Sequence, residues 1–267
     1  MRILVYLLSV FLVCMSSCEE LIHVDLNTGD PRYVIEADLD NISSTQTIRV
    51  SQTVAFNADK ASEPIDDAQV EVKSSGGQRY VFYPMGDGYY QNANFTPKPN
   101  STYYLSVKID DEVFTATEVM QPFINVDSIG SLEETIFNET NYSVLVKFSD
   151  PLGQADYYKY LVSINQQPFR FFQAYSDKYN DGLYVTHQLT DFTKPFALGD
   201  SILVRRQIIT KPVFDYWNQI QMLNPGSAAP ANPKSNISNG AFGYFSVSNS
   251  KDYGITIRSY DQLKLRE

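Results

Sequence analysis

The chain of 267 residues is long enough to form two domains of ordinary size. Aromatic residues make up 13% of it and charged residues only 19%, which excludes an intrinsically disordered protein and predicts a sizeable hydrophobic core. The 21 Lys and Arg against 31 Asp and Glu give a net charge of −10, which excludes nucleic acid as a partner because such a surface repels the phosphate backbone.

Residues 1–17 have the pattern of a lipoprotein signal peptide. Arg2 supplies a positive charge, and residues 3–15 form an apolar run that a single serine interrupts. This run is shorter than the roughly 20 apolar residues that cross a bilayer, but it suits the core of a cleaved signal. It ends in Met-Ser-Ser-Cys, which resembles the lipobox of bacterial lipoproteins with Met in place of the usual Leu. The resemblance predicts lipidation of Cys18, with a plain secretory signal as the alternative.

The use of cysteine agrees with a lipid anchor. Cys14, the only other cysteine, lies in the segment that we expect to be removed. The mature chain therefore cannot form a disulfide framework or a cysteine-based metal site. Glu19 and Glu20 follow Cys18 and resemble the signal that sends lipoproteins of the phylum Bacteroidota to the outer face of the outer membrane. We expect a lipid-anchored outer-membrane protein exposed on the cell surface, with the periplasmic face as the alternative.

The first half of the mature chain has the pattern of a β domain. Residues 18–31 read as a lipidated tether that ends in a turn. Residues 32–120 then contain seven short segments of alternating apolar and polar residues, separated by turns with Gly or Asp. These segments are residues 32–38, 47–55, 68–73, 79–83, 88–92, 102–109 and 112–120. The pattern predicts an N-terminal β-sandwich of immunoglobulin-like or prealbumin-like type.

Residues 121–267 are expected to form a C-terminal β domain. Pro122 indicates the boundary, because proline cannot donate a hydrogen bond to a sheet. The candidate strands are residues 125–131, 142–149, 157–165, 169–173, 183–188, 201–210, 243–248 and 253–259. One helix is predicted at residues 212–223, with Pro212 in its first turn and an apolar stripe on one side. The predicted fold class is therefore all-β, with two tandem β-sandwich domains and one α-helix inserted in the second.

The segment 176–182 is a weak candidate for a calcium site. Asp177, Asn180 and Asp181 place oxygen ligands just before a glycine, and oxygen atoms are the ligands that Ca²⁺ prefers. The segment lacks the full EF-hand pattern and its closing bidentate glutamate. A plain hairpin loop, in which Asn-Asp-Gly supplies the turn, is the favoured alternative.

Aromatic residues gather on two neighbouring predicted strands. Their rings lie on both faces of the strands, so one set packs in the core and the other is available for contact with a sugar or a partner. Tyr157, Phe171 and Tyr175 are the candidate contact residues. Packing within the core is the favoured alternative for such rings.

The sequence has few of the residues and motifs that are typical of hydrolases. The mature chain has two histidines, His23 and His187, and no Gly-x-Ser-x-Gly motif, so neither a zinc site nor a Ser-His-Asp triad is expected. The adjacent acid pairs at 66–67, 110–111 and 133–134 are typical of turns, because neighbours on a strand point to opposite faces. We expect no enzyme and no cofactor. A glycan hydrolase with two convergent carboxyl groups stays an alternative.

Several short motifs resemble one family in order and spacing. They are VFDYW at 213–217, SNI at 235–237 and GYFS at 243–246, preceded by CEE at 18–20, YVIEA at 33–37, AQVEV at 68–72 and DPLG at 150–153. The chain resembles the Bacteroidota lipoproteins described as domain of unknown function 4249, whose members are typically encoded beside TonB-dependent outer-membrane receptors. The resemblance implies a non-enzymatic accessory subunit that helps a TonB-dependent transporter to capture a solute or nutrient, and it carries over Cys18 alone as a site. The alternatives are a surface glycan-binding or glycan-hydrolysing lipoprotein and an adhesin-like structural module.

Overall fold

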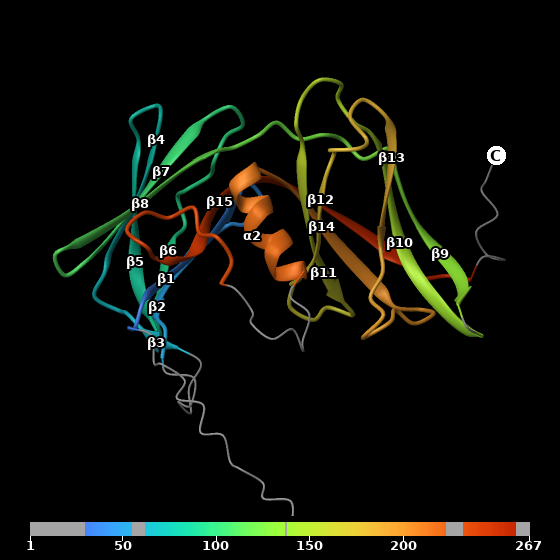
Figure 1. Cartoon of the computed structure of the whole chain (residues 1–267), viewed down its shortest axis with the longest axis horizontal. Helices are drawn as coiled ribbons and strands as arrows, with labels where there is room; N and C mark the ends of the chain where they lie inside the picture. The colour runs from blue at the N-terminus through green and yellow to red at the C-terminus, as the bar shows by residue number, and fades with distance from the viewer. Residues whose placement is uncertain (1–29, 55–61, 137, 223–231, 260–267) are drawn as a thin grey trace, which may run out of the picture.

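The structure is a computed structural model that describes residues 30–54, 62–136, 138–222 and 232–259 (Figure 1). The predicted signal peptide, Cys18 and nearly all of the tether lie outside the described residues. The described part of the chain is mainly β with one helix, which confirms the β-rich class that the alternating pattern predicts. No helix in the described ranges is both long and apolar enough to cross a membrane.

The described residues form fifteen strands and one helix. The strands are β1 (Tyr33–Asp40), β2 (Gln46–Gln52), β3 (Glu63–Pro64), β4 (Gln69–Ser74), β5 (Arg79–Gly86), β6 (Tyr89–Asn92), β7 (Thr102–Ile109), β8 (Glu112–Val119), β9 (Ser128–Ile136), β10 (Glu139–Ser149), β11 (Tyr157–Ile164), β12 (Arg170–Ser176), β13 (Tyr184–Leu189), β14 (Ser201–Ile209) and β15 (Phe242–Thr256). The helix is α2 (Lys211–Met222), close to the predicted residues 212–223.

Most strands belong to one large mixed sheet of twelve strands. Its order is β12-β11-β14-β15-β1-β2-β6-β5-β4-β7-β8, and β3 pairs with β2 beside this path. A separate three-stranded sheet has the order β13-β10-β9. The pairing of β1 with β15 is parallel, and the other pairings within the described chain are antiparallel.

The last strand differs from the sequence prediction. Two strands are predicted, at 243–248 and 253–259, whereas the structure has the single strand Phe242–Thr256. The polar residues 249–252 look like a turn in the sequence, but each of them pairs with β14. Asn249 and Ser250 are buried, whereas Lys251 and Asp252 are exposed. The buried polar groups here are hydrogen bonded to β14 and to nearby loops. Where this strand is most buried, polar residues interrupt the alternating pattern, so the pattern does not predict one continuous strand.

This long strand connects the two predicted domains. Its first half pairs with β1, from Val34↔Phe242 to Asp40↔Ser248. Its second half pairs with β14, from Ile208↔Asn249 to Ser201↔Thr256. Figure 1 shows β15 running from the region of β1 toward that of β14. A single sheet thus extends through both predicted domains, and residues 242–248 complete the sheet of the first.

Among the described residues, buried apolar side chains form two large cores and a smaller cluster under helix α2, where Ile209, Val213 and Tyr244 meet. The first core takes side chains from β1, β2 and the start of β15 on one side and from β4, β7 and β8 on the other. The second core lies between the three-stranded sheet and β11, β14 and the end of β15. Helix α2 covers β11 and β12, where Trp217 stacks on Phe171 with 4.4 Å between ring centroids. Each core is formed by the buried faces of strands whose alternate side chains point toward solvent.

A buried acid ties the two halves together. Glu118 on β8 is only 3% exposed. Its carboxylate accepts hydrogen bonds from the Thr210 hydroxyl at 2.6 Å and from the Asn236 amide at 2.8 Å. Asn236 also bonds the backbone C=O and N–H of Phe245 on β15, at 2.8 and 2.9 Å. Burial raises the pKa of Glu118 to about 7, and the two hydrogen bonds oppose this rise without cancelling it.

We expect the variant Glu118→Gln to weaken the dependence of stability on pH. The raised pKa means that the folded state holds the proton more tightly than the unfolded chain, so this contribution is complete below pH 4.5 and is lost as the pH rises to about 7. The wild type should lose on the order of 3 kcal/mol more than Glu118→Gln between these limits. Urea unfolding at pH 5 and pH 8 measures it, with Glu112→Gln, an exposed acid on the same strand, as the control. Parallel pH curves for all three proteins would refute the role of Glu118.

Candidate functional site

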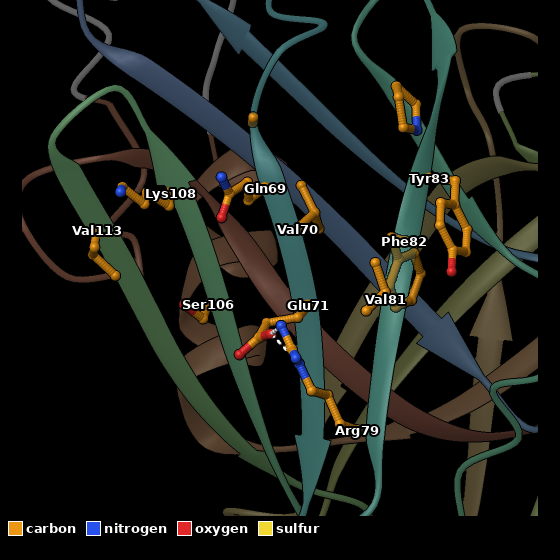
Figure 2. Close-up of a pocket in the computed structure, with 12 residues that line it drawn as sticks. Gln69, Val70, Glu71, Arg79, Val81, Phe82, Tyr83, Ser106, Lys108 and Val113 are labelled. Atoms are coloured by element: carbon orange, nitrogen blue, oxygen red, sulfur yellow. Dashed lines mark hydrogen bonds and ion pairs between the residues drawn. The ribbon is translucent and has the colours of Figure 1, made fainter.

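The candidate binding site is a groove formed where two neighbouring strands separate (Figure 2). β4 and β5 pair only from Val70↔Phe82 to Lys73↔Arg79. Beyond Phe82, β5 pairs with β6 instead, with an irregular register between Pro84 and Gly86. Proline is tolerated at such an irregularity because no ladder hydrogen bond is needed from its nitrogen. The change of partner opens a groove of about 430 Å³ on the outer side of β4, β5, β7 and β8.

The groove combines a small apolar base with a polar surround. Its lining residues are Ala68, Gln69, Val70, Glu71, Arg79, Val81, Phe82, Tyr83, Pro84, Ser106, Lys108 and Val113. Val70 and Phe82 belong to the first core, and because side chains alternate along a strand, their neighbours Gln69, Glu71 and Tyr83 face outward. Figure 2 shows the polar side chains of β4 and β7 beside those of β5. The site is thus built on strands that the first core holds in place.

A charged network organises the lower end of the groove. Glu71 forms an ion pair with Lys73, with 3.0 Å between nitrogen and oxygen, and a second one with Arg79. Partial burial acts to raise the pKa of Glu71, but the hydrogen bonds from Lys73 and Arg79 outweigh it and lower that pKa. Glu71 is therefore ionised at neutral pH and acts as a hydrogen-bond acceptor rather than as a general acid.

An exposed aromatic ring lies at the edge of the groove. The Tyr83 side chain is 64% exposed although it is large and mainly apolar. Tyr104 on β7, which lies on the other side of β4, is exposed to 45%, but it does not line the groove. An exposed ring beside fixed hydrogen-bonding groups is typical of a surface that binds hydrophilic ligands.

A family profile matches most of the chain. The sequence profile described as "Domain of unknown function (DUF4249)" matches residues 19–253. The chain belongs to the DUF4249 family. The match covers all of the groove residues and all of both cores except Ile255 and Ile257.

This DUF4249 chain was also compared with curated proteins and with solved structures. No curated protein matches it significantly. Among solved structures it is similar to a two fibronectin type-III domain segment from chicken tenascin, at 11% sequence identity. That similarity covers 86% of this chain and 100% of the tenascin segment, with a TM-score of 0.24. A score this low carries no argument about fold or function.

Two of the three predicted contact aromatics pack against the helix of this DUF4249 chain. Tyr157 lies against Phe214, with ring centroids 5.1 Å apart, and Phe171 stacks on Trp217. One face of each ring is thus occupied within the protein. Their role in ligand contact stays a prediction, whereas the outward ring of Tyr83 lies in a groove.

The third predicted aromatic is part of the second core. Tyr175 stacks on His187 with centroids 4.0 Å apart, and its hydroxyl donates to the carbonyl oxygen of Gln188. Burial, together with the positive charge of Arg206, lowers the pKa of His187 to about 3. His187 is therefore neutral at physiological pH and packs as a ring.

The three predicted calcium ligands have different hydrogen-bond partners, and their joint binding of calcium stays a prediction. Asp181 accepts a hydrogen bond from the backbone N–H of Gly153, at 2.7 Å. The Asn180 N–H donates to the carbonyl oxygen of Asp177, which closes the turn. The Asp177 carboxylate instead lies beside two other acids, Asp150 and Asp156. The sequence shows no signal for this grouping, because strand ends far apart in the chain bring it together.

The sequence patterns do not predict the groove residues as a binding site. The alternation in β4 and β5 predicts that Glu71 and Tyr83 face outward, but it does not show where the two strands separate. The signal that was available is Pro84, which is unfavourable inside a paired strand.

Proposed function

We propose that this DUF4249 protein is a non-enzymatic lipoprotein of the outer membrane that captures a solute for a TonB-dependent transporter. The observation that carries the proposal is the groove, which combines the exposed ring of Tyr83 with hydrogen-bonding side chains. Its volume falls within the roughly 300–1,000 Å³ that is usual for small-molecule sites. A saccharide suits it best, because a sugar offers an apolar face to an aromatic ring and hydroxyl groups to Glu71, Arg79 and Gln69.

The anchoring of the chain supports this function. A lipid on Cys18 would hold the protein at the membrane, and the tether of residues 18–31 spans at most about 50 Å. The tether leads into β1, which belongs to the same sheet as the groove. The groove would thus stay within reach of a transporter in the same membrane. We interpret the two cores as two sandwich-like domains, 32–120 and 121–267, that share β15.

The pKa values of the carboxyl groups favour ligand binding over hydrolysis. A glycoside hydrolase needs a carboxyl group with a raised pKa beside the sugar. In the groove, the pKa of Glu71 is lowered. Within the described ranges, burial raises the pKa of Asp156 to about 6 and that of Glu118 to about 7, and neither residue lines the groove. An adhesin-like module is disfavoured in turn because it needs no such concave site.

Replacing Tyr83 by alanine should weaken saccharide binding by about tenfold. The loss of one stacking ring is worth about 1.5 kcal/mol, which corresponds to that factor. Binding of the purified protein to a glycan array of mono-, di- and oligosaccharides measures the effect. Tyr104→Ala removes another exposed tyrosine ring, which lies outside the groove, and should bind as the wild type does. Equal binding by both variants, or no binding to any sugar, would contradict the saccharide site.

A further inference from the structure

Three buried carboxylates meet at one end of the second core. Asp150 follows β10, Asp156 precedes β11, and Asp177 follows β12. Because β11 and β12 are antiparallel, with Tyr157 opposite Ser176, Asp156 and Asp177 come to the same end. One oxygen of each acid lies within 4.8 Å of an oxygen of the other two. Their exposed fractions are only 6%, 2% and 6% in chain order.

Hydrogen bonds hold most of the carboxylate oxygens in place. The Tyr158 hydroxyl donates to Asp150 Oδ1, and the Gly182 N–H approaches Asp150 Oδ2 at 3.3 Å. The backbone N–H of Asp156 donates to Asp177 Oδ2 at 2.8 Å. The side-chain amide of Gln154 donates to Asp156 Oδ1 at 2.6 Å. The cluster is therefore a fixed arrangement and not a set of loose surface acids.

One buried carboxylate oxygen of the cluster has no donor among the described residues. Asp156 Oδ2 is buried and has no hydrogen-bond partner among the described residues. A buried carboxylate oxygen that has lost its water and found no donor is strongly unfavourable, so it marks a place where a cation or an unseen donor belongs. This unpaired oxygen belongs to Asp156, which lies beside the carboxylates of Asp150 and Asp177.

The charges of the cluster are only partly balanced within the protein. Arg206 is the cation whose charge acts on Asp156, and within the described residues it forms no ion pair with the cluster. Its guanidinium lies over the rings of Phe148 and Tyr158 and donates to the carbonyl of Ile124. Three carboxylates and one guanidinium leave two negative charges, which a divalent cation would neutralise.

We propose that Asp150, Asp156 and Asp177 bind one Ca²⁺ ion. Calcium binds oxygen at 2.3–2.6 Å, so two oxygens on one ion lie at most about 5 Å apart, in agreement with the spacing of the cluster. All three ligands are hard oxygen donors, which disfavours zinc. Magnesium is disfavoured because it keeps several of its waters, and this site is buried.

The ion would tie together two surface loops. Residues 150–156 connect β10 to β11, and residues 177–183 connect β12 to β13. The loops already touch, since a Cβ built on Gly182 would lie 2.6 Å from a methyl carbon of Leu152. Leu152 and Tyr179, both more than 80% exposed, lie on these loops. Bound calcium would therefore fix the surface that presents them.

Calcium titration of the full-length protein in detergent, after removal of metal with EDTA, tests the site. Calorimetry with CaCl₂ should show one ion per chain, and the Tm should rise by about 5–10 °C at a 100-fold excess over the Kd. Asp156→Asn should weaken calcium binding at least tenfold. The metal-free form of this variant should melt no lower than the metal-free wild type, since it loses one of three repelling charges.

Asp181→Asn is the matched control, because Asp181 lies in the same loop but bonds Gly153 and not the cluster. It should bind calcium as the wild type does. The absence of heat and of a Tm shift up to millimolar CaCl₂, or an unchanged response of Asp156→Asn, would overturn the proposal. Saccharide binding to the groove is a separate readout, so failure of either site does not imply failure of the other.

Discussion

Replacing Gly243 by alanine is expected to disrupt the pairing of β15 with β1 and to remove more than about 4 kcal/mol of stability. Gly243 has a φ of +90°, which side chains with a Cβ rarely adopt. A Cβ at this position would lie 2.0 Å from the carbonyl oxygen of Ile35 and 2.7 Å from its carbonyl carbon. Both are backbone atoms in the paired strand β1, so no side chain can move to relieve the overlap.

The size of this loss follows from where the clash lies. The pair Ile35↔Gly243 stands near the start of the parallel ladder that joins the chain's last strand to its first. A domain of this kind has only about 5–15 kcal/mol of net stability, so the variant should be largely unfolded or poorly expressed. Urea unfolding followed by circular dichroism measures it.

Gly254→Ala is the matched control on the same strand. A Cβ built on Gly254 has nothing within 4 Å, and its φ lies outside the left-handed region. This variant should differ from the wild type by less than about 1 kcal/mol. Equal stability of Gly243→Ala and Gly254→Ala would contradict the close approach of β15 to β1.

The second large effect is expected from Lys159→Met, which should cost about 3–5 kcal/mol. The Lys159 ammonium on β11 is fully buried and pairs with Asp38 on β1, with 2.5 Å between nitrogen and oxygen. It also lies 5.0 Å from the ring of Trp217 and 5.5 Å from that of Tyr244. Burial lowers the pKa of Lys159, and the attraction of Asp38 opposes that change.

Most of this loss comes from the partner that is left behind. Without Lys159, the carboxylate of Asp38 loses its ion-pair partner in a mostly buried place, where one of its oxygens already lacks a hydrogen bond among the described residues. The double variant Lys159→Met with Asp38→Asn should therefore recover about 2 kcal/mol. A double-mutant cycle by urea unfolding measures the coupling, and additive losses would contradict it. Lys211→Met removes the exposed ion pair with Asp215 and should change stability little.

The sequence predicts most of the strands within residues 32–120, because one face of each strand is exposed to solvent. Residues 102–109 alternate in the sequence, and the structure places β7 at Thr102–Ile109 with every second residue buried. The strand β15 could not be predicted in this way, since its polar middle is buried between both halves and hydrogen bonded there. Pattern alone does not distinguish such a segment from a turn.

The sites depend on tertiary contacts that no local pattern contains. The groove exists because β5 leaves β4 after Phe82, and pairing partners are not encoded by alternation. Asp177 is identified in the sequence as a candidate ligand, but Asp150 and Asp156 join it only through the packing of three strand ends. Cys18, by contrast, is predicted from a motif that acts during export and needs no folded structure.

The central claim is best tested by a pull-down of the tagged native protein from outer membranes in a gentle detergent, with mass spectrometry of the bound proteins and of the N-terminal peptide. We expect a lipid on Cys18 and a TonB-dependent receptor in near-equal amount. A lipidated Cys18 without such a receptor would contradict the proposed role as a transporter subunit.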